Sequence, residues 1–120
     1  MKDGDVVVMA LPQQDGTVKD RPALCLRRLP PFQDLMVCGI STQLQQFAPE
    51  LDETITPADS DFRTSGLKAP SLIRLGYLAV VPATKCRGRI GSISETRLDR
   101  LLTKLSDFIC PKPTSSNKPK

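Results

Sequence analysis

The chain has 120 residues, a length typical of one domain, and 39% of its residues are hydrophobic and 25% charged, as in ordinary globular proteins. It contains no histidine, and its four cysteines form no Cys-X-X-Cys pair. These facts exclude Ser-His-Asp and Cys-His catalysis and argue against a zinc site, so we expect neither a metal nor a cofactor.

The formal net charge of +4 depends on the C-terminal end of the chain. Residues 111–120 hold three lysines and no acid, which leaves 17 − 3 = 14 basic against 13 acidic groups in residues 1–110. We interpret residues 1–110 as a single domain and residues 111–120 as a disordered basic tail. Any attraction of the domain for nucleic acid must therefore come from how its charges are distributed.

The charges of this domain are segregated along the chain. Residues 46–62 hold five acids and no base, whereas residues 84–104 hold six bases and two acids. Two interpretations stay open at this point: a solvated surface, which such charge runs usually form, or a patch that faces phosphate.

Cysteine usage and hydropathy predict where the protein works. Cys25 and Cys38 lie inside apolar runs, where a cysteine usually behaves as a small buried hydrophobe. Reduced thiols and the lack of a signal peptide predict a cytoplasmic protein. No apolar run approaches the roughly 18–20 residues of a membrane span, so we expect no membrane partner.

Residues 5–11 are apolar and β-branched and predict a buried strand. Residues 12–20 carry proline, glycine and polar side chains and predict a loop, long for a hairpin connection. Residues 22–26 and 35–40 predict the next two strands, with a turn at residues 29–34 between them.

In the second half, Thr56 as N-cap and Pro57 in the first helical position predict the start of a short helix that Gly66 ends. Residues 72–75 and 77–81 predict two further strands, split at Gly76. A basic segment interrupted by glycines follows at residues 87–91.

The last element has the clearest pattern. Ser94 is a suitable N-cap, and leucines, Phe108 and Ile109 recur at helical spacing up to the proline at position 111. The opposite face carries Arg97, Arg100 and Lys104, which we interpret as solvated surface or, less simply, as a contact. The whole order predicts an α+β, mostly β fold, with a small, partly closed antiparallel sheet and a C-terminal helix.

Three short motifs take the interpretation beyond fold class. They are residues 4–8 (GDVVV), residues 21–24 (RPAL) and residues 39–43 (GISTQ). Together with residues 65–75 and 89–94, they resemble the MazF/PemK toxin family in order and spacing over roughly residues 3–109. The resemblance implies an SH3-like barrel, a homodimer, cleavage of single-stranded RNA, and a cognate antitoxin protein as partner.

The same resemblance implies roles for individual residues. Arg21 occupies the position of the family's catalytic arginine, and Ser41 that of its catalytic threonine, with Thr42 as the alternative if the register slips by one. Lys19, Thr42 and Gln43 are candidate contacts to RNA. A guanidinium can donate two hydrogen bonds to a phosphate, which suits the charge that develops when RNA is cleaved to 2′,3′-cyclic phosphate and 5′-hydroxyl ends.

The general base stays open between Asp15 and Asp20, which both lie in the predicted loop. The chain also departs from the family, since Gly76 stands where many members have an acidic or polar residue and only 4% of residues are aromatic. Three functions therefore compete: an RNA-cleaving toxin, an inactive relative that serves as a protein- or nucleic-acid-binding module, and a nucleic-acid-binding barrel unrelated to toxins.

Overall fold

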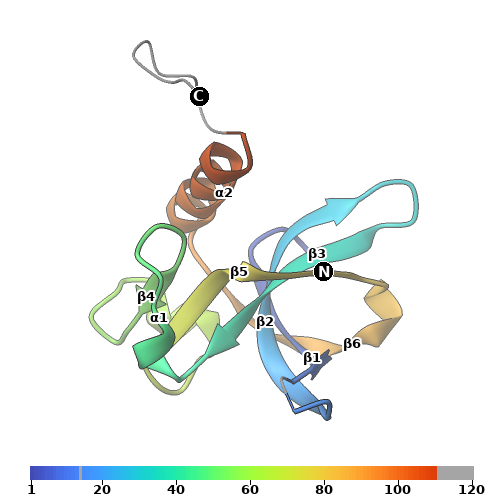
Figure 1. Ribbon diagram of the computed structural model, residues 1–120, viewed down its shortest axis with the longest axis horizontal. Coiled ribbons are helices and arrows are strands. Elements are labelled where there is room, and N and C mark those ends of the chain that lie inside the picture. The colour runs from blue at the N-terminus through green and yellow to red at the C-terminus, as the bar shows by residue number, and fades with distance from the viewer. Residues whose placement is uncertain (14, 111–120) are drawn as a thin grey trace.

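The computed structural model describes residues 1–13 and 15–110, in which a six-stranded sheet is followed by a C-terminal helix (Figure 1). None of the helices in these residues is long and apolar enough to cross a membrane. The predicted basic tail lies outside the described residues. In chain order the elements are β1 (Asp5–Pro12), β2 (Val18–Leu29), β3 (Asp34–Ser41), the 3-10 helix η1 (Leu44–Gln46), β4 (Glu53–Ile55), α1 (Phe62–Ser65), β5 (Ser71–Val81), the 3-10 helix η2 (Ala83–Lys85), β6 (Cys86–Ser92) and α2 (Glu95–Ile109).

All neighbouring strands run antiparallel, in the order β4-β5-β3-β2-β1-β6. This arrangement confirms the predicted mostly β class with a helix at the C-terminus. The order has two ends, and across the described residues no ladder joins β4 to β6. The hydrogen-bonded sheet is therefore open, and its closure into an SH3-like barrel stays a prediction.

The free edge of β6 is covered by backbone rather than by another strand. A side chain at Gly91 would collide with the carbonyl oxygen of Thr64, and one at Gly66 would collide with that of Ile90. The backbone around α1 thus lies directly against the backbone of β6. This close approach is possible because Gly66 and Gly91 have no Cβ atom. Such cover protects an edge that would otherwise offer unpaired backbone groups to other chains.

The connection predicted at residues 12–20 is shorter than expected, because Pro12 and residues 18–20 belong to strands. β1 and β2 pair as far as Pro12 opposite Val18, so only residues 13–17 connect them. Within the connection, the Asp15 carboxylate accepts hydrogen bonds from the amide and the hydroxyl of Thr17, and Gly16 takes a φ of +88°. The loop prediction was correct in place but too wide, because cross-strand pairing of Lys19 and Asp20 with β1 overrode their loop-like composition.

The predicted break at Gly76 is a bulge inside one long strand, β5. Gly39 of β3 pairs with Arg74, whereas its neighbour Cys38 pairs with Leu78, so residues 75–77 have no partner in the register. A bulge of this kind bends the strand and redirects side chains. It places Arg74 and Tyr77 beside the ends of β1 and β3, which matters for the site described below.

The helix predicted to start at Thr56 begins later, at Phe62. The Thr56 amide donates to the Asp59 carboxylate over 2.8 Å, and the Asp59 amide donates back to the Thr56 carbonyl, so this segment forms a turn. Thr56 does take part in side-chain and backbone hydrogen bonds of the kind found at helix N-termini, but here they form a turn and no helix begins at this residue. Gly66 ends α1 in the left-handed conformation, as predicted.

Helix α2 begins as predicted. The Ser94 hydroxyl accepts a hydrogen bond from the Arg97 amide over 3.1 Å, which satisfies one of the free amides of the first turn. The apolar face is buried at Leu101 and Leu105, but Phe108 and Ile109 are 59% and 67% exposed. Only the first turns of the helix therefore pack on the sheet, and its end extends away from it (Figure 1).

The sheet is apolar on both faces, which explains its unbroken hydrophobic runs. Successive residues of a strand alternate between the faces, so Val6 and Val7 belong to different clusters. Cys38 lies in the larger cluster under α2 and Cys25 in the smaller one, and both thiols are buried as predicted. The smaller cluster comprises Val7, Met9, Leu11, Ala23, Cys25, Leu35 and Val37.

The acidic and basic stretches of the sequence pair with each other. Arg97 is only 5% exposed, and its guanidinium donates to both carboxylate oxygens of Asp61, at 2.8 and 3.1 Å, and to Glu53 at 3.0 Å. Arg100 binds the Glu53 carboxylate through two further hydrogen bonds, and Lys104 lies 3.5 Å from it. The interpretation of this helix face as solvated surface or as a contact was therefore wrong for the buried Arg97, whereas the Arg100 side chain is 50% exposed.

The Arg97→Ala variant is expected to unfold with a free energy about 3–5 kcal/mol lower than the wild type, because it leaves the buried Asp61 carboxylate without its cation. Urea denaturation followed by circular dichroism measures this difference. Arg63→Ala is the matched control, since Arg63 is exposed on α1 and should change stability by no more than about 0.5 kcal/mol. Equal losses in the two variants would contradict a stabilising role of the network.

The same network makes stability depend on pH. Burial raises the pKa of Glu53 and of Asp61, but hydrogen bonds and charges from Arg100 and Arg97 more than offset it, so both pKa values lie below the ordinary values of 4.5 and 3.8. Carboxylates with a lowered folded pKa stabilise the protein above the unfolded pKa, and that contribution disappears as the pH falls through the folded one. We expect the free energy of unfolding to fall below about pH 4, and to fall less steeply in Arg97→Ala.

Candidate active site

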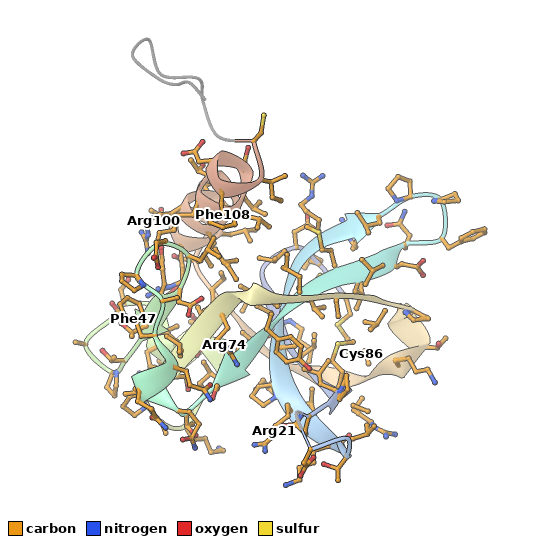
Figure 2. The ribbon with its side chains drawn as sticks, viewed as in Figure 1. Arg21, Phe47, Arg74, Cys86, Arg100 and Phe108 are labelled. Atoms are coloured by element: carbon orange, nitrogen blue, oxygen red, sulfur yellow. The ribbon has the colours of Figure 1, made fainter. Side chains whose placement is uncertain are left out.

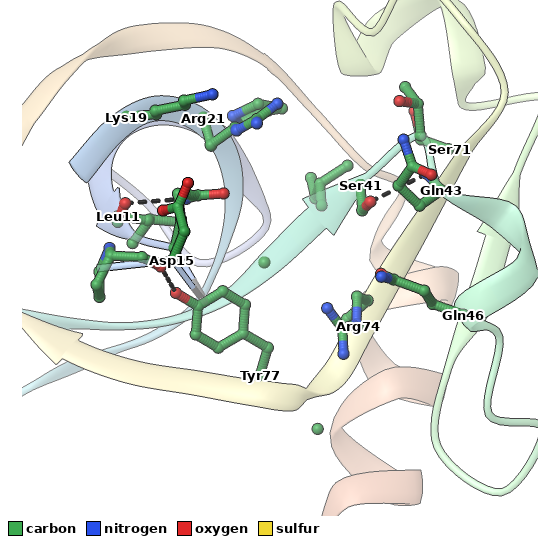
Figure 3. Close-up of a pocket in the computed structure, with 17 residues that line it drawn as sticks. Leu11, Asp15, Lys19, Arg21, Ser41, Gln43, Gln46, Ser71, Arg74 and Tyr77 are labelled. Carbon is green, nitrogen blue, oxygen red and sulfur yellow. Dashed lines mark hydrogen bonds between the residues drawn. The ribbon is translucent and has the colours of Figure 1, made fainter. Parts of the chain in front are cut away.

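A pocket of about 800 Å³ lies where the β1–β2 hairpin, the end of β3 and the bulge of β5 meet (Figure 3). Its volume is in the upper part of the range of about 300–1,000 Å³ typical of ligand sites. The structure brings together in it all five residues that the sequence predicted for the site: Lys19, Arg21, Ser41, Thr42 and Gln43. Their individual roles stay predictions.

Arg21 reaches the pocket because of strand alternation. It pairs with Met9 of β1, and Lys19 pairs with Leu11, so both cations share a sheet face with Ala23 and the smaller core. The side chains of Lys19 and Arg21 are both exposed, at the edge of the smaller core cluster. The extended backbone that a following proline imposes on Arg21 suits this strand position.

Ser41 ends β3 opposite Leu72. Its hydroxyl oxygen accepts a hydrogen bond from the Gln43 amide over 3.0 Å, and the Gln43 side chain in turn accepts one from Gln45. Ser41 therefore forms a turn, the ordinary role of a serine at a strand end. Its hydroxyl proton is not used by that bond and can still be donated to a ligand.

Tyr77 was not identified from the sequence, although it forms one wall of the pocket. Its ring lies against Gly39 of the neighbouring strand, where a Cβ would come within 2.7 Å of the ring carbon Cδ2. Its hydroxyl donates to the Pro12 carbonyl at the end of β1. The ring is thus held from two sides. A glycine in the middle of β3 and a single tyrosine in the chain were the only signals available.

Arg74 was also missed. Its guanidinium lies 5.9 Å from the centre of the Tyr77 ring, close enough for a cation–π contact. In Figures 2 and 3, Arg74 reaches the pocket from β5, whereas Arg21 reaches it from β2 on another side. The position of Arg74 in the pocket could not be predicted from the sequence, because the bulge that brings it here is a tertiary feature of the pairing between β3 and β5.

The pocket is cationic. Lys19, Arg21 and Arg74 line it, against one carboxylate, Asp15. Within residues 1–13 and 15–110 none of these three cations forms an ion pair, whereas six other arginines do. Positive groups without a protein partner attract an anionic ligand.

The two candidate bases differ in position. Asp15 lines the pocket, and hydrogen bonds from the Thr17 side chain and amide lower its pKa. Asp20 is not among the pocket residues, and it pairs with Arg87 at 3.2 Å. Asp15 is therefore the better placed of the two, although a lowered pKa makes a carboxylate a weaker base.

The thiols of the two cores are inert to ordinary chemistry. Burial, and then the charges of Asp3 and Asp5, raise the pKa of Cys25 to about 11, and burial raises that of Cys38 further. Nor do the described residues contain a group of three or more Cys, Asp or Glu side chains that could hold a metal ion.

Sheet order, C-terminal helix and pocket together define a small α+β domain with a cationic cleft at one end of its sheet. The family of PemK-like, MazF-like toxins of type II toxin-antitoxin systems matches residues 2–109. The chain therefore belongs to this family, which confirms the resemblance seen in its motifs.

Solved structures agree with this assignment. Thirty-six of their chains match significantly, among them the Mycobacterium tuberculosis toxin MazF-mt6. The match to MazF-mt6 has 18% sequence identity and a TM-score of 0.66, and it covers 88% of this chain and 95% of that one. At this level of identity the match establishes a common fold. The comparison with curated proteins found no significant match.

Gly39→Ala is expected to lower the free energy of unfolding by about 1–3 kcal/mol, because the added methyl group displaces the Tyr77 ring. In a Tyr77→Ala background the same substitution should cost much less, since the ring is gone. Urea denaturation of the four proteins gives the coupling energy of the double-mutant cycle. Strictly additive effects would show that the ring does not rest on Gly39.

Proposed function

We propose that this protein is the toxin of a type II toxin–antitoxin pair and cleaves single-stranded RNA, including mRNA, without a metal ion. The observation that carries the proposal is the pocket, where Arg21 lies without an ion-pair partner in the described chain and shares the cavity with Ser41. Family membership supports the reaction, since MazF/PemK toxins are endoribonucleases. RNA in the cytoplasm is the substrate.

In the proposed reaction the 2′-oxygen of a ribose attacks the adjacent phosphorus. The bond from that phosphorus to the 5′-oxygen of the next nucleotide breaks, which leaves a 2′,3′-cyclic phosphate and a 5′-hydroxyl end. The 2′-hydroxyl loses a proton, and the leaving oxygen gains one. Negative charge accumulates on the non-bridging oxygens at the transition state, where preorganised donors act most strongly.

Arg21 supplies those donors in the proposal. A guanidinium offers a planar pair of N–H groups that matches two phosphate oxygens, and it keeps its charge throughout the reaction. Since Arg21 stands on a strand rather than on a free loop, its backbone is already fixed before RNA binds. Little reorganisation is then required at the moment of reaction.

Ser41 contributes a second donor. Its oxygen is held by the Gln43 amide, which orients the hydroxyl while leaving the proton free for a phosphate oxygen. Thr42 lines the same cavity and is the alternative donor. Asp15 is the candidate for the group that accepts the 2′-hydroxyl proton, because Asp20 is engaged with Arg87.

Lys19 and Gln43 are the proposed contacts to the rest of the RNA strand. Lys19 contributes charge beside Arg21, and the Gln43 amide can read the edge of a base. The partners in this proposal are the cognate antitoxin, which covers the pocket, and a second copy of the chain. Exposed apolar side chains on β5, Leu78 at 41% and Val80 at 58%, support a homodimer.

Cleavage of a long single-stranded RNA in EDTA tests the reaction. We expect fragments with cyclic-phosphate ends from the wild type, and a rate about 100–1,000-fold lower from Arg21→Ala, which removes a transition-state donor. Ser41→Ala should cleave more slowly than the wild type but faster than Arg21→Ala, because the Thr42 hydroxyl lines the same cavity and replaces the lost donor in part. Gel electrophoresis and end-group analysis provide the measurements.

The Arg63→Gln variant is the control, because it removes one exposed arginine outside the pocket and should cleave at the wild-type rate. If the wild-type protein left RNAs of many different sequences intact, the proposed nuclease activity would be wrong. The inactive binding module would then be the better explanation, and it is favoured by the ordinary turn role of Ser41 and the lowered pKa of Asp15.

A further inference from the structure

Asp52 is a buried acid with no cation beside it. The residue is 4% exposed, and within residues 1–13 and 15–110 its carboxylate forms no ion pair. Its two oxygens instead accept backbone amides, Oδ2 from Ala48 over 3.0 Å and Oδ1 from Leu75 over 3.1 Å. Hydrogen bonds of this kind partly replace the hydration that a buried charge has lost. The carboxylate therefore connects two segments that are distant in sequence, and each of them leads to the pocket.

The first segment, residues 43–52, follows the end of β3. Gln43 and Gln46 line the pocket near its beginning (Figure 3). After them the chain folds into a turn, in which the Asp52 amide donates to the Ala48 carbonyl over 2.7 Å and the Ala48 amide donates back to the Asp52 side chain. Asp52 thus closes this turn with both its backbone and its carboxylate. It anchors the end of a segment whose beginning forms one wall of the pocket.

The second segment is the bulge of β5. Residues 75–77 have no partner on β3, and on the other side β4 pairs with β5 only as far as Ile73. The amide of Leu75 lies beyond that pair, and Asp52 Oδ1 takes the place that a strand carbonyl would otherwise occupy. The bond from Leu75 therefore holds the strand where it leaves the ladder and leads to Tyr77, whose ring forms another wall of the pocket.

Asp52 supplies the directional link between the two segments. Among the side-chain hydrogen bonds of the described residues, the one from Leu75 is the only bond that joins residues 43–52 to β5. Apolar contact adds to it, since a Cβ at Gly76 would lie 3.8 Å from the Leu51 side chain. Such contact is not directional, whereas a hydrogen bond restricts both distance and angle. The relative position of the two walls therefore depends on Asp52.

We propose that Asp52 is a positioning residue of the candidate active site, whose carboxylate fixes the wall of Gln43 and Gln46 relative to the wall of Tyr77. The inference rests on the proposed function in taking RNA as the ligand. Asp52 is not among the residues that line the pocket, so it acts through the segments that it joins. A pocket whose walls are held before binding loses less affinity to the ordering of those walls.

Tyrosine fluorescence tests the positioning without any ligand. Tyr77 is the single tyrosine of the chain, which has no tryptophan, so the signal reports this wall alone. Asp52→Asn keeps the size of the side chain but replaces one acceptor oxygen by an NH2 group, so only one of the two amides keeps its partner. We expect acrylamide to quench this variant more strongly than the wild type, with a quenching constant shifted toward that of the urea-unfolded chain.

Leu105→Ala is the matched control for stability. It removes a buried side chain of α2 that does not line the pocket, so it should lower the urea midpoint but leave the quenching of Tyr77 unchanged. Amide hydrogen exchange of the wild-type protein tests the same link without a substitution. The Leu75 amide should be protected as strongly as the ladder amides of β5, and rapid exchange there would overturn the proposal.

Binding of an RNA that cannot be cleaved tests the consequence for the ligand. The probe is a short 2′-O-methyl RNA of randomised sequence, because it lacks the attacking hydroxyl. Loss of a negative charge near a cationic pocket would by itself strengthen binding, whereas loosened walls weaken it. We expect Asp52→Asn to bind about 10-fold more weakly, as for a pocket that is assembled in about one-tenth of the molecules. Leu105→Ala should bind like the wild type.

The other outcomes separate this inference from the proposed function. Tighter binding by Asp52→Asn, an unchanged affinity, or unchanged quenching would each overturn the positioning role. An equal loss of affinity in Leu105→Ala would assign the effect to stability and overturn it as well. If quenching rises only in Asp52→Asn but the wild type binds no RNA, Asp52 still fixes the walls and only RNA as the ligand is wrong. The expected binding without cleavage of ordinary RNA would overturn only the nuclease.

Discussion

The guanidinium of Arg97 connects parts of the chain that lie far apart in sequence. It stands in the first turn of α2 and binds Asp61 and Glu53, which precede it by 36 and 44 residues. Asp61 also accepts the Ser94 amide, so its carboxylate sits at the start of α2, where the helix dipole favours negative charge. Glu53 pairs across the sheet with Ile73, next to Arg74. The buried network therefore supports the strand from which the pocket's second arginine extends.

The ion pairs of this network also determine which cationic side chains are still available to bind a ligand. The sequence left open whether the basic stretch is solvated surface or a patch facing phosphate, but three of its six cations are engaged by the acidic stretch through Glu53 and Asp61. Arg87 and Arg89 pair with aspartates of β2 and β1. The cations left to the pocket come from elsewhere, namely β2 and β5. Net charge and charge runs were thus poor guides, because they count groups without showing which of them are already paired.

The elements that could be predicted are those governed by local chemistry. The Ser94 cap, the Gly66 terminator and the apolar strands follow from interactions within a few residues, and the motif around Arg21 identified one wall of the pocket. The errors arose where distant segments decide the outcome. Residues 18–20 became strand because β1 pairs with them, and the break expected at Gly76 became a bulge because β3 continues past it. Nothing near Arg74 or Tyr77 in sequence could show that contact with β3.

If RNA is the ligand, as proposed, the wall formed by Tyr77 limits how the pocket can recognise it. Tyr77 is the one aromatic residue among those that line the pocket, and its ring has Gly39 against it and the Arg74 guanidinium beside it. A ring packed in this way has little free face on which a base could stack, although stacking is the usual source of affinity for single strands. In the proposed function, recognition of RNA then relies on phosphate contacts and on polar groups such as Gln43 and Gln46, which line the same space. Binding of this kind is set by charge and weakens steeply with salt, so the nearly neutral domain still depends on two or three well-placed cations.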